Sequence, residues 1–233
     1  MPQYAQYPRF NYTQLYLLTA DIARCILYLS VHMRFLILLP LTGVRFLPGG
    51  IADFYLVVRA ICAVVDCFDY VTIFGKIPRE SQVVHPQLGN LIFTLLEHLV
   101  VSLAILCYPK IAKNNAFTTL VYSESLVEVI RYYYNFYKVR TFDRRHKTLR
   151  FCKKLSYTIL VPVQVLAEMC LLLDSLQFQS YYEELAEYDF GIKVGIRILL
   201  LFYLPAFYTV YKGKLYDYYI LAWVTSKEHA KKI

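Results

Sequence analysis

Long apolar stretches recur along this chain of 233 residues, and each is about the length that a helix needs to cross a bilayer. A membrane-spanning helix needs roughly 20 mostly apolar residues. Apolar residues make up 58% of the sequence, more than the roughly half found in soluble domains. We therefore predict an all-α, polytopic membrane protein in which residues 1–233 form a single six-transmembrane-helix bundle. The predicted spans are 15–33, 54–75, 88–108, 117–137, 155–176 and 192–211.

The charge distribution predicts an orientation in the membrane. The formal net charge is +8, but the basic residues flank apolar spans and form no separate basic domain, which argues against a nucleic-acid partner. The loop 138–154 is strongly basic, the next loop, 179–190, is acidic, and the tail from Lys212 is basic again. By the positive-inside rule, the basic loop and the tail are cytosolic, and six spans then place the N-terminus in the cytosol as well.

Three smaller features qualify this outline. The stretch 35–43, FLILLPLTG, is too short for a further span and is expected to extend the first helix or to lie at the membrane interface. The six cysteines lie mostly inside apolar segments without a CxxC pair, so we expect small buried side chains and neither a disulfide framework nor a metal site. The C-terminal KEHAKKI resembles a dilysine retrieval signal of the endoplasmic reticulum with its lysines displaced by one position, and a plain solvated tail is the alternative.

Ionisable residues recur inside the predicted spans, where they are costly and usually face the interior of the bundle. Asp21 with Arg24, and Glu128 with Arg131, are each three residues apart on one helix, so each is a candidate ion pair. The sequence has no HExxH pattern, and we predict no metal site. The full set is Asp21, Arg24, Arg59, Asp66, Asp69, Glu97, His98, Glu124, Glu128, Arg131, Glu168 and Asp174.

Glu168 differs from the others because no basic residue lies one helical turn away. Positions 164, 165, 171 and 172 are Gln, Val, Leu and Leu. A carboxyl group without a charged partner in apolar surroundings is how many general acid–base residues are tuned. The alternative is a protonated glutamic acid that is hydrogen-bonded to a neighbouring helix.

Several blocks of the sequence resemble one known family. SLVEVIRYYYNFYK (125–138), followed by YTILVPVQVLAE (157–168), is similar to two blocks of the very-long-chain 3-hydroxyacyl-CoA dehydratases of fatty-acid elongation, also called protein-tyrosine-phosphatase-like proteins. The family pattern is roughly Thr-Glu-Ile-Ile-Arg-Tyr, then Leu-Tyr-Pro-x-Gly-x-x-x-Glu one helix later. Weaker matches follow the same order over nearly the whole chain: YLLTADIARCILYLS (16–30), VVDCFD (64–69), HPQLGNLIF (85–93) and LLLFYLPAFYTVYKGKL (199–215).

The resemblance implies a multi-pass enzyme of the endoplasmic reticulum membrane with cytosolic termini, which dehydrates long- and very-long-chain (3R)-3-hydroxyacyl-CoA to trans-2-enoyl-CoA. It implies no cofactor beyond the CoA of the substrate. The implied partners are long-chain acyl-CoA, the bilayer and other elongase-cycle enzymes. It places the catalytic carboxyl group on Glu168. The supporting positions that it assigns are Glu128, Arg131, Gln87, Lys153 and Asp66.

The sequence departs from the family pattern close to that carboxyl group. The catalytic Tyr seven residues before the Glu is replaced by Val161, the Gly by Gln164, and an Arg near the third span by Leu91. Residues 161 and 168 share a helix face, but valine can neither donate nor accept a proton. Tyr157 lies one turn earlier, roughly 16 Å along the axis from Glu168, and is a weak surrogate. Tyrosines of the fourth span are another source of a phenol.

Two functions therefore stay open. The first is an active or weakly active dehydratase of the elongation cycle. The second is a catalytically impaired member that acts as a membrane interaction or scaffold protein for elongase components or acyl chains. The function of a basic rim is open in the same way, because CoA phosphates and anionic lipid headgroups would both bind it. The rim comprises Lys153, Lys154, Arg144, Arg145 and Lys147.

Overall fold

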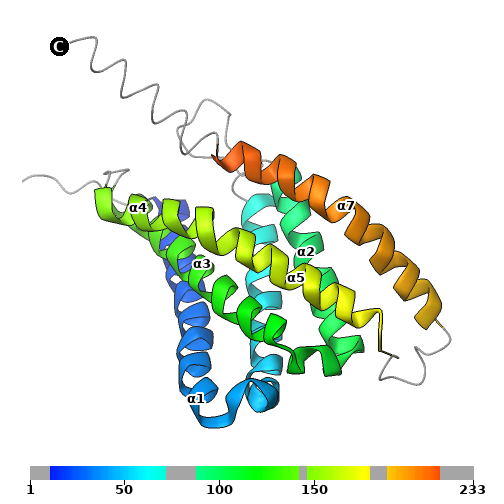
Figure 1. Cartoon of the computed structure of the whole chain (residues 1–233). Coiled ribbons are helices and arrows are strands. Elements are labelled where there is room, and N and C mark those ends of the chain that lie inside the picture. The colour runs from blue at the N-terminus through cyan, green and yellow to red at the C-terminus, as the bar shows by residue number, and fades with distance from the viewer. Residues whose placement is uncertain (1–10, 72–87, 142–145, 179–187, 216–233) are drawn as a thin grey trace, which may run out of the picture.

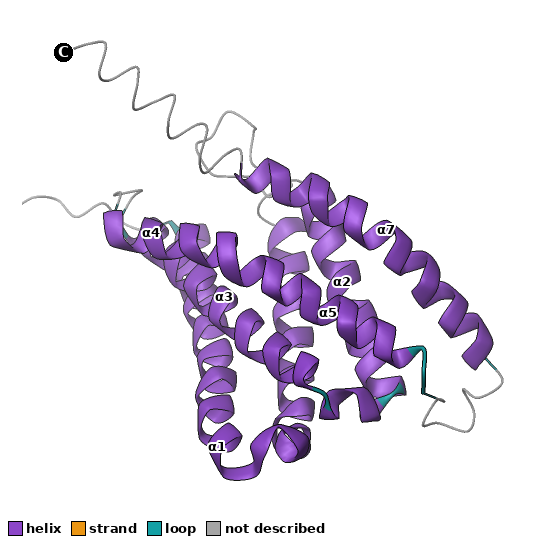
Figure 2. Ribbon diagram, viewed as in Figure 1, coloured by secondary structure: helices purple, strands orange, loops and turns teal. Residues whose placement is uncertain are grey.

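The computed structural model describes residues 11–71, 88–141, 146–178 and 188–215, and all regular structure in these ranges is helical (Figure 2). This confirms the all-α class for the described part of the chain. The helices are α1 (Tyr12–Asp69), α2 (Leu88–Cys107), the short η2 (Pro109–Lys113), α3 (Asn115–Arg140), α4 (Lys147–Leu155), the π-helical turn η3 (Ser156–Leu160), α5 (Val161–Ser175) and α7 (Asp189–Leu215).

Helix α1 consists of two arms that run back along each other (Figure 1). The reversal occurs at Gly43, whose φ of 70° and ψ of 170° are not helical and belong to a region that is essentially restricted to glycine. At Gly50 the arms are close, because a Cβ atom there would lie 2.9 Å from the Cδ1 atom of Leu38, and the leucine side chain would have to shift. The stretch 35–43 thus extends the first helix, one of its two expected positions.

The N-terminus of α1 shows how the sequence defines a helix boundary. Asn11 is the N-cap, and its side chain accepts a hydrogen bond of 2.8 Å from the backbone N–H of Tyr12. The side chain of Gln14 accepts a hydrogen bond of 3.1 Å from the backbone N–H of Asn11, which completes a capping box. The polar residues before the first apolar stretch therefore start the helix at this point.

Helices α3 and α5 form the centre of the bundle (Figure 1). Helix α3 packs along α1 on one side and along α5 on the other, while α2 contacts α1 and α5. Helix α4 continues through η3 into α5, so that these three elements form one helical stretch from Lys147 to Ser175. Helix α7 lies at the edge of the bundle and contacts α5. These contacts place α3 and α5 between α1 and α7, with α2 packed against α1 and α5.

Three of the described helical stretches are long and apolar enough to cross a membrane: Tyr12–Val44, Lys147–Ser175 and Asp189–Thr209. A shorter apolar helix covers Thr94–Cys107. Helices also occupy the other predicted spans, but the second arm of α1 and helix α3 carry the ionisable residues noted above, which lowers their apolar content. The described helices therefore support a membrane protein, and three spans rather than six meet the criterion of length and composition.

Candidate functional site

Two helices carry polar residues along one face, and these two faces meet inside the bundle. The spacing of four and three residues keeps such side chains on one side of a helix. Because α1 and α3 pack along each other, the polar faces become internal. The residues on α1 are Tyr55, Arg59, Cys62, Asp66 and Asp69, and those on α3 are Glu124, Glu128 and Arg131.

Arg59 lies at the centre of the first group of polar side chains, which we call the inner cluster. Its Nε atom is 3.2 Å from Oε1 of Glu124, and its Nη2 atom is 3.1 Å from Oε1 of Glu168. All three side chains are 0% exposed. Arg59 therefore joins the second arm of α1 to α3 and α5 at once. The inner cluster comprises Tyr55, Arg59, Glu97, His98, Glu124, Gln164, Glu168 and Tyr203.

Both carboxylate oxygens of Glu168 are engaged by protein donors. Oε1 accepts from Nη2 of Arg59 and, at 3.3 Å, from Nε2 of Gln164 on the same helix. Oε2 accepts a hydrogen bond from the hydroxyl group of Tyr203, which comes from α7. The side chain of Glu168 is thus held by three donors from three helices.

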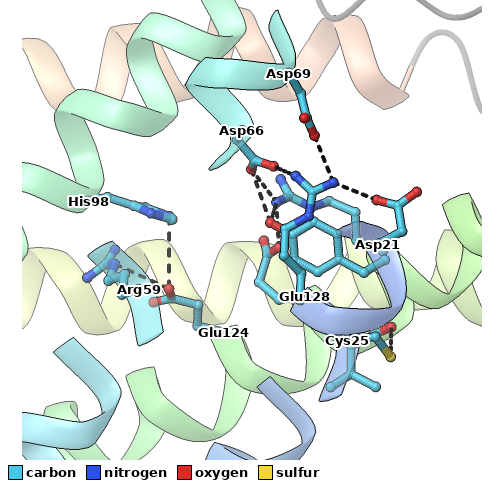
Figure 3. Close-up of polar contacts among 12 residues, drawn as sticks. Asp21, Cys25, Arg59, Asp66, Asp69, His98, Glu124 and Glu128 are labelled. Carbon is cyan, nitrogen blue, oxygen red and sulfur yellow. Dashed lines mark hydrogen bonds and ion pairs between the residues drawn. The ribbon is translucent and has the colours of Figure 1, made fainter. Parts of the chain in front are cut away.

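The remaining members extend the inner cluster towards α2. The hydroxyl group of Tyr55 donates to Oε2 of Glu124. Nε2 of His98 lies 3.9 Å from Oε1 of Glu124, a contact that Figure 3 shows. Nε2 of Gln164 also lies 3.3 Å from Oε1 of Glu97. The cluster thus places three carboxyl groups around one guanidinium group, and its hydrogen bonds connect five helices, α1, α2, α3, α5 and α7.

A second group, the outer cluster, lies near the ends of the α1 arms (Figure 3). Arg24 pairs with Asp21 at 2.9 Å, with Asp69 at 2.9 Å and with Asp66. Arg131 pairs with Asp66 at 2.9 Å and with Glu128 at 2.7 Å. These distances confirm both ion pairs that the sequence predicted. The outer cluster comprises Asp21, Arg24, Asp66, Asp69, Glu128 and Arg131.

The predicted site residues fall into separate places. Glu168 belongs to the inner cluster, whereas Glu128, Arg131 and Asp66 meet in the outer cluster. Lys153 lies with its Nζ atom 4.0 Å from the ring centroid of Tyr134, at the basic end of the bundle. Gln87 lies outside the described residues.

Tyr157 and position 161, the two positions considered for a phenol, precede Glu168 on the same helical stretch. Tyr157 lies in the π-helical turn before α5, and its ring centroid is 6.0 Å from Nζ of Lys153. Val161, at the position of the family Tyr, begins α5 and is partly buried. The phenol that contacts Glu168 is instead that of Tyr203, which the sequence did not single out.

The expectation that Glu168 has no charged partner was wrong. No basic residue lies one helical turn from Glu168 on its own helix, but Arg59, which is 109 positions earlier in the chain, is its partner. The sequence contained one usable signal, because Arg59 stands in the middle of a predicted span and has to be matched by a charge on another helix.

A groove of about 480 Å³ lies between the N-terminal part of α3 and α5. Its lining includes Thr119, Leu166 and Cys170, which are exposed on the outer side of the bundle. Ala167 also lines the groove, whereas its neighbour Glu168 is not among the lining residues. The groove therefore does not open onto the inner cluster.

A family model described as "Protein tyrosine phosphatase-like protein, PTPLA" matches residues 86–217, more than half of the chain. The chain belongs to this family. The match confirms the resemblance drawn from the sequence, since PTPLA is the family of very-long-chain 3-hydroxyacyl-CoA dehydratases. The matched residues include α3, α5 and α7, which supply Glu124, Glu168 and Tyr203 to the inner cluster.

Among curated proteins, the chain is similar to a distant relative that is a divergent member of the PTPLA family. The Beta-1,6-glucan synthesis-associated protein KEG1 of Saccharomyces cerevisiae is 26% identical over 195 residues, which cover 84% of this chain and 92% of the relative. No solved structure matches. The similarity to KEG1 therefore extends over most of both chains.

Proposed function

We propose that this PTPLA-family chain is a catalytically impaired member that works as a membrane interaction protein associated with β-1,6-glucan synthesis. The observation that carries the proposal is the state of Glu168. Both oxygens of the family's catalytic carboxyl group are held by side chains of the protein itself. In this arrangement Glu168 connects helices instead of facing a substrate.

The chemistry of dehydration explains why this matters. The reaction removes a proton from C2 and a hydroxyl group from C3, so a base and an acid have to lie within about 2.6–3.2 Å of the groups they serve. Glu168 is 0% exposed and is ion-paired with Arg59. Val161 cannot supply the acid, and the groove beside α5 is not lined by Glu168. A substrate would have to displace Arg59 or Tyr203 before it reached the carboxylate.

The ion pair itself supports a structural role. A buried guanidinium group shared by two carboxylates fixes the relative positions of α1, α3 and α5, because breaking such a pair leaves an uncompensated charge. The process, β-1,6-glucan synthesis, is taken from the name of the relative KEG1, and the similarity to this chain covers 92% of KEG1. We propose that the region that this chain shares with KEG1 holds a partner of the glucan-synthesis machinery in the membrane.

Complementation tests this proposal. The chain is expressed in S. cerevisiae cells depleted of KEG1, and alkali-insoluble β-1,6-glucan is measured per unit of folded protein. We expect restoration by the wild-type chain and by Glu168→Gln, scaled to its folded amount. Asp174→Asn, on the same helix but outside the inner cluster, where the carboxyl group accepts a hydrogen bond from Asn114, is the matched control. Normal abundance of the wild-type chain without any recovery of glucan would refute the association.

The second candidate is a dehydratase, and one observation favours it. The Tyr203 hydroxyl group on Oε2 of Glu168 rebuilds a phenol–carboxyl pair from a different helix than the family uses. In this mechanism Glu168 takes the C2 proton, Tyr203 protonates the departing C3 hydroxyl group, and trans-2-enoyl-CoA and water are the products. Long-chain acyl-CoA and elongase-cycle enzymes are then the partners, and no cofactor is needed beyond the CoA of the substrate. Turnover that is lost in both Glu168→Gln and Tyr203→Phe supports this candidate.

We further propose six spans with both termini in the cytosol, in the membrane of the endoplasmic reticulum. Helices at all six predicted positions support the number of spans. The basic residues of α4 and of the C-terminal turn of α3 support the cytosolic side of that end. Glycosylation sequons engineered into 138–154 and into the loop after α5 test the orientation, because only a lumenal sequon is modified.

A further inference from the structure

Helix α4 extends a membrane helix beyond the hydrocarbon core. The continuous stretch Lys147–Ser175 has 29 residues and is apolar enough to cross a membrane. At about 1.5 Å per residue it is roughly 43 Å long, whereas the hydrocarbon core of a bilayer is about 30 Å thick. Its C-terminal part, α5, is packed into the bundle, so the excess length falls on α4.

The nine residues of α4 separate into two faces. Phe151, Cys152 and Leu155 lie on one side at helical spacing, and Phe151 is 63% and Leu155 is 47% exposed. Arg150 lies on the other side, Lys147 lies one turn before Phe151 at the border of the two faces, and both basic residues are exposed. The sequence of α4, KTLRFCKKL, contains no acidic residue. An apolar face beside a basic face is typical of a helix that lies in the headgroup region.

Aromatic side chains mark the same level of the bundle. Tyr133 on α3 is 50% exposed, and the ring of its neighbour Tyr134 lies 4.0 Å from Nζ of Lys153. The rings of Tyr137 and His146 meet edge to face at 5.6 Å. Tyrosine is enriched where membrane helices leave the hydrocarbon. Figure 1 shows α4 beside the end of α3 that carries these tyrosines. The aromatic belt thus independently places α4 at the membrane surface.

We propose that α4 is a binding surface for anionic phospholipid headgroups of the adjoining leaflet. The side chains of Phe151 and Leu155 enter the boundary of the acyl chains, and those of Lys147 and Arg150 contact lipid phosphate and carboxylate groups. The proposal goes beyond the proposed function, because it assigns the exposed basic residues of α4, Lys147 and Arg150, to the bilayer and not to the phosphates of CoA. Near an anionic surface, each basic residue strengthens binding by roughly five-fold.

Lipid binding by the full chain in detergent tests the proposal, with phosphatidylserine and phosphatidylcholine as probes and retained lipid counted by native mass spectrometry. We expect tighter binding of phosphatidylserine, weakened roughly 25-fold in Lys147→Gln/Arg150→Gln, with binding of phosphatidylcholine unchanged. The matched control is Lys110→Gln/Lys113→Gln, two exposed lysines of η2 at the opposite end of α3.

Three results would overturn the proposal. The first is equal binding of the two lipids, and the second is an equal loss in the two double variants. The third is displacement of phosphatidylserine by CoA or inorganic phosphate at concentrations below that of the lipid, which would assign the basic rim to a free phosphoryl ligand. Unchanged melting temperatures of both variants show that a loss of binding is not a loss of folding.

Discussion

Replacing Arg59 with methionine removes the cation that Glu124 and Glu168 share. The guanidinium group is completely buried and lies 3.2 Å and 3.1 Å from the two carboxylates. Methionine fills most of the volume of the arginine stem but leaves two buried carboxylates facing each other. Removing one partner of a buried ion pair typically costs about 3–5 kcal/mol. Because two pairs are lost here, we expect about 4–5 kcal/mol, or roughly a thousand-fold in the folding equilibrium constant.

The assay is equilibrium unfolding of the purified chain in mixed micelles of increasing SDS fraction. Arg34→Met is the matched control, since Arg34 lies on the same helix α1, is exposed and has its guanidinium carbon 5.4 Å from the ring of Phe54. The triple variant Arg59→Met/Glu124→Gln/Glu168→Gln should recover most of the loss, because it removes the charges together. If Arg59→Met costs only about 0.6 kcal/mol, the average for a polar contact between membrane helices, the reasoning from buried charge is refuted.

Three further predictions concern single contacts or positions. Tyr203→Phe removes a donor to the buried carboxylate of Glu168 and should lower the free energy of unfolding in mixed micelles by about 1–3 kcal/mol; an unchanged value would contradict that hydrogen bond. Gly43→Ala should cost about 1–3 kcal/mol in the same assay, because a side chain is strained at φ 70° and ψ 170°, and a neutral result would argue against the reversal in α1. Cys62, 1% exposed, should react with maleimide only after unfolding, and rapid reaction in the folded protein would contradict its burial.

The helices were largely predictable because their signals are local. Apolar length and terminal polar residues located all six helical positions, and the spacing of three residues identified the pairs Asp21–Arg24 and Glu128–Arg131. The break in α1 was harder to interpret, since FLILLPLTG is as apolar as the helix that it extends. A single glycine with positive φ decides where the first arm ends, and apolar content carries no information about that dihedral angle.

The candidate site was only half predictable, because its contacts join distant parts of the chain. Sequence reasoning placed Glu168 inside the bundle, and the structure finds it fully buried. It could not identify Arg59 or Tyr203 as partners of Glu168, because these residues lie on other helices, 109 and 35 positions away in the chain. Helical spacing identifies neighbours one turn apart, whereas the partners of a buried carboxylate depend on how whole helices pack.

The departures from the family pattern become understandable together. Gln164 replaces the family glycine and donates to Oε1 of Glu168, the same oxygen that accepts a hydrogen bond from Arg59. Val161, in place of the tyrosine, removes the phenol from this helix. Gln164 thus adds one donor to the carboxylate, and Val161 removes the phenol that the family pattern places on this helix. This pattern supports our proposal that the chain is a catalytically impaired member of the family.

The most direct test of the account is a dehydration assay on the purified chain. The protein is supplied with 3-hydroxypalmitoyl-CoA, formation of trans-2-enoyl-CoA is followed, and a competent dehydratase of the family is measured in the same detergent. The account predicts no product above the level of Glu168→Gln while the competent enzyme turns over. Substrate-dependent product that disappears in both Glu168→Gln and Tyr203→Phe, with both variants folded, would contradict it and identify Glu168 and Tyr203 as an acid–base pair.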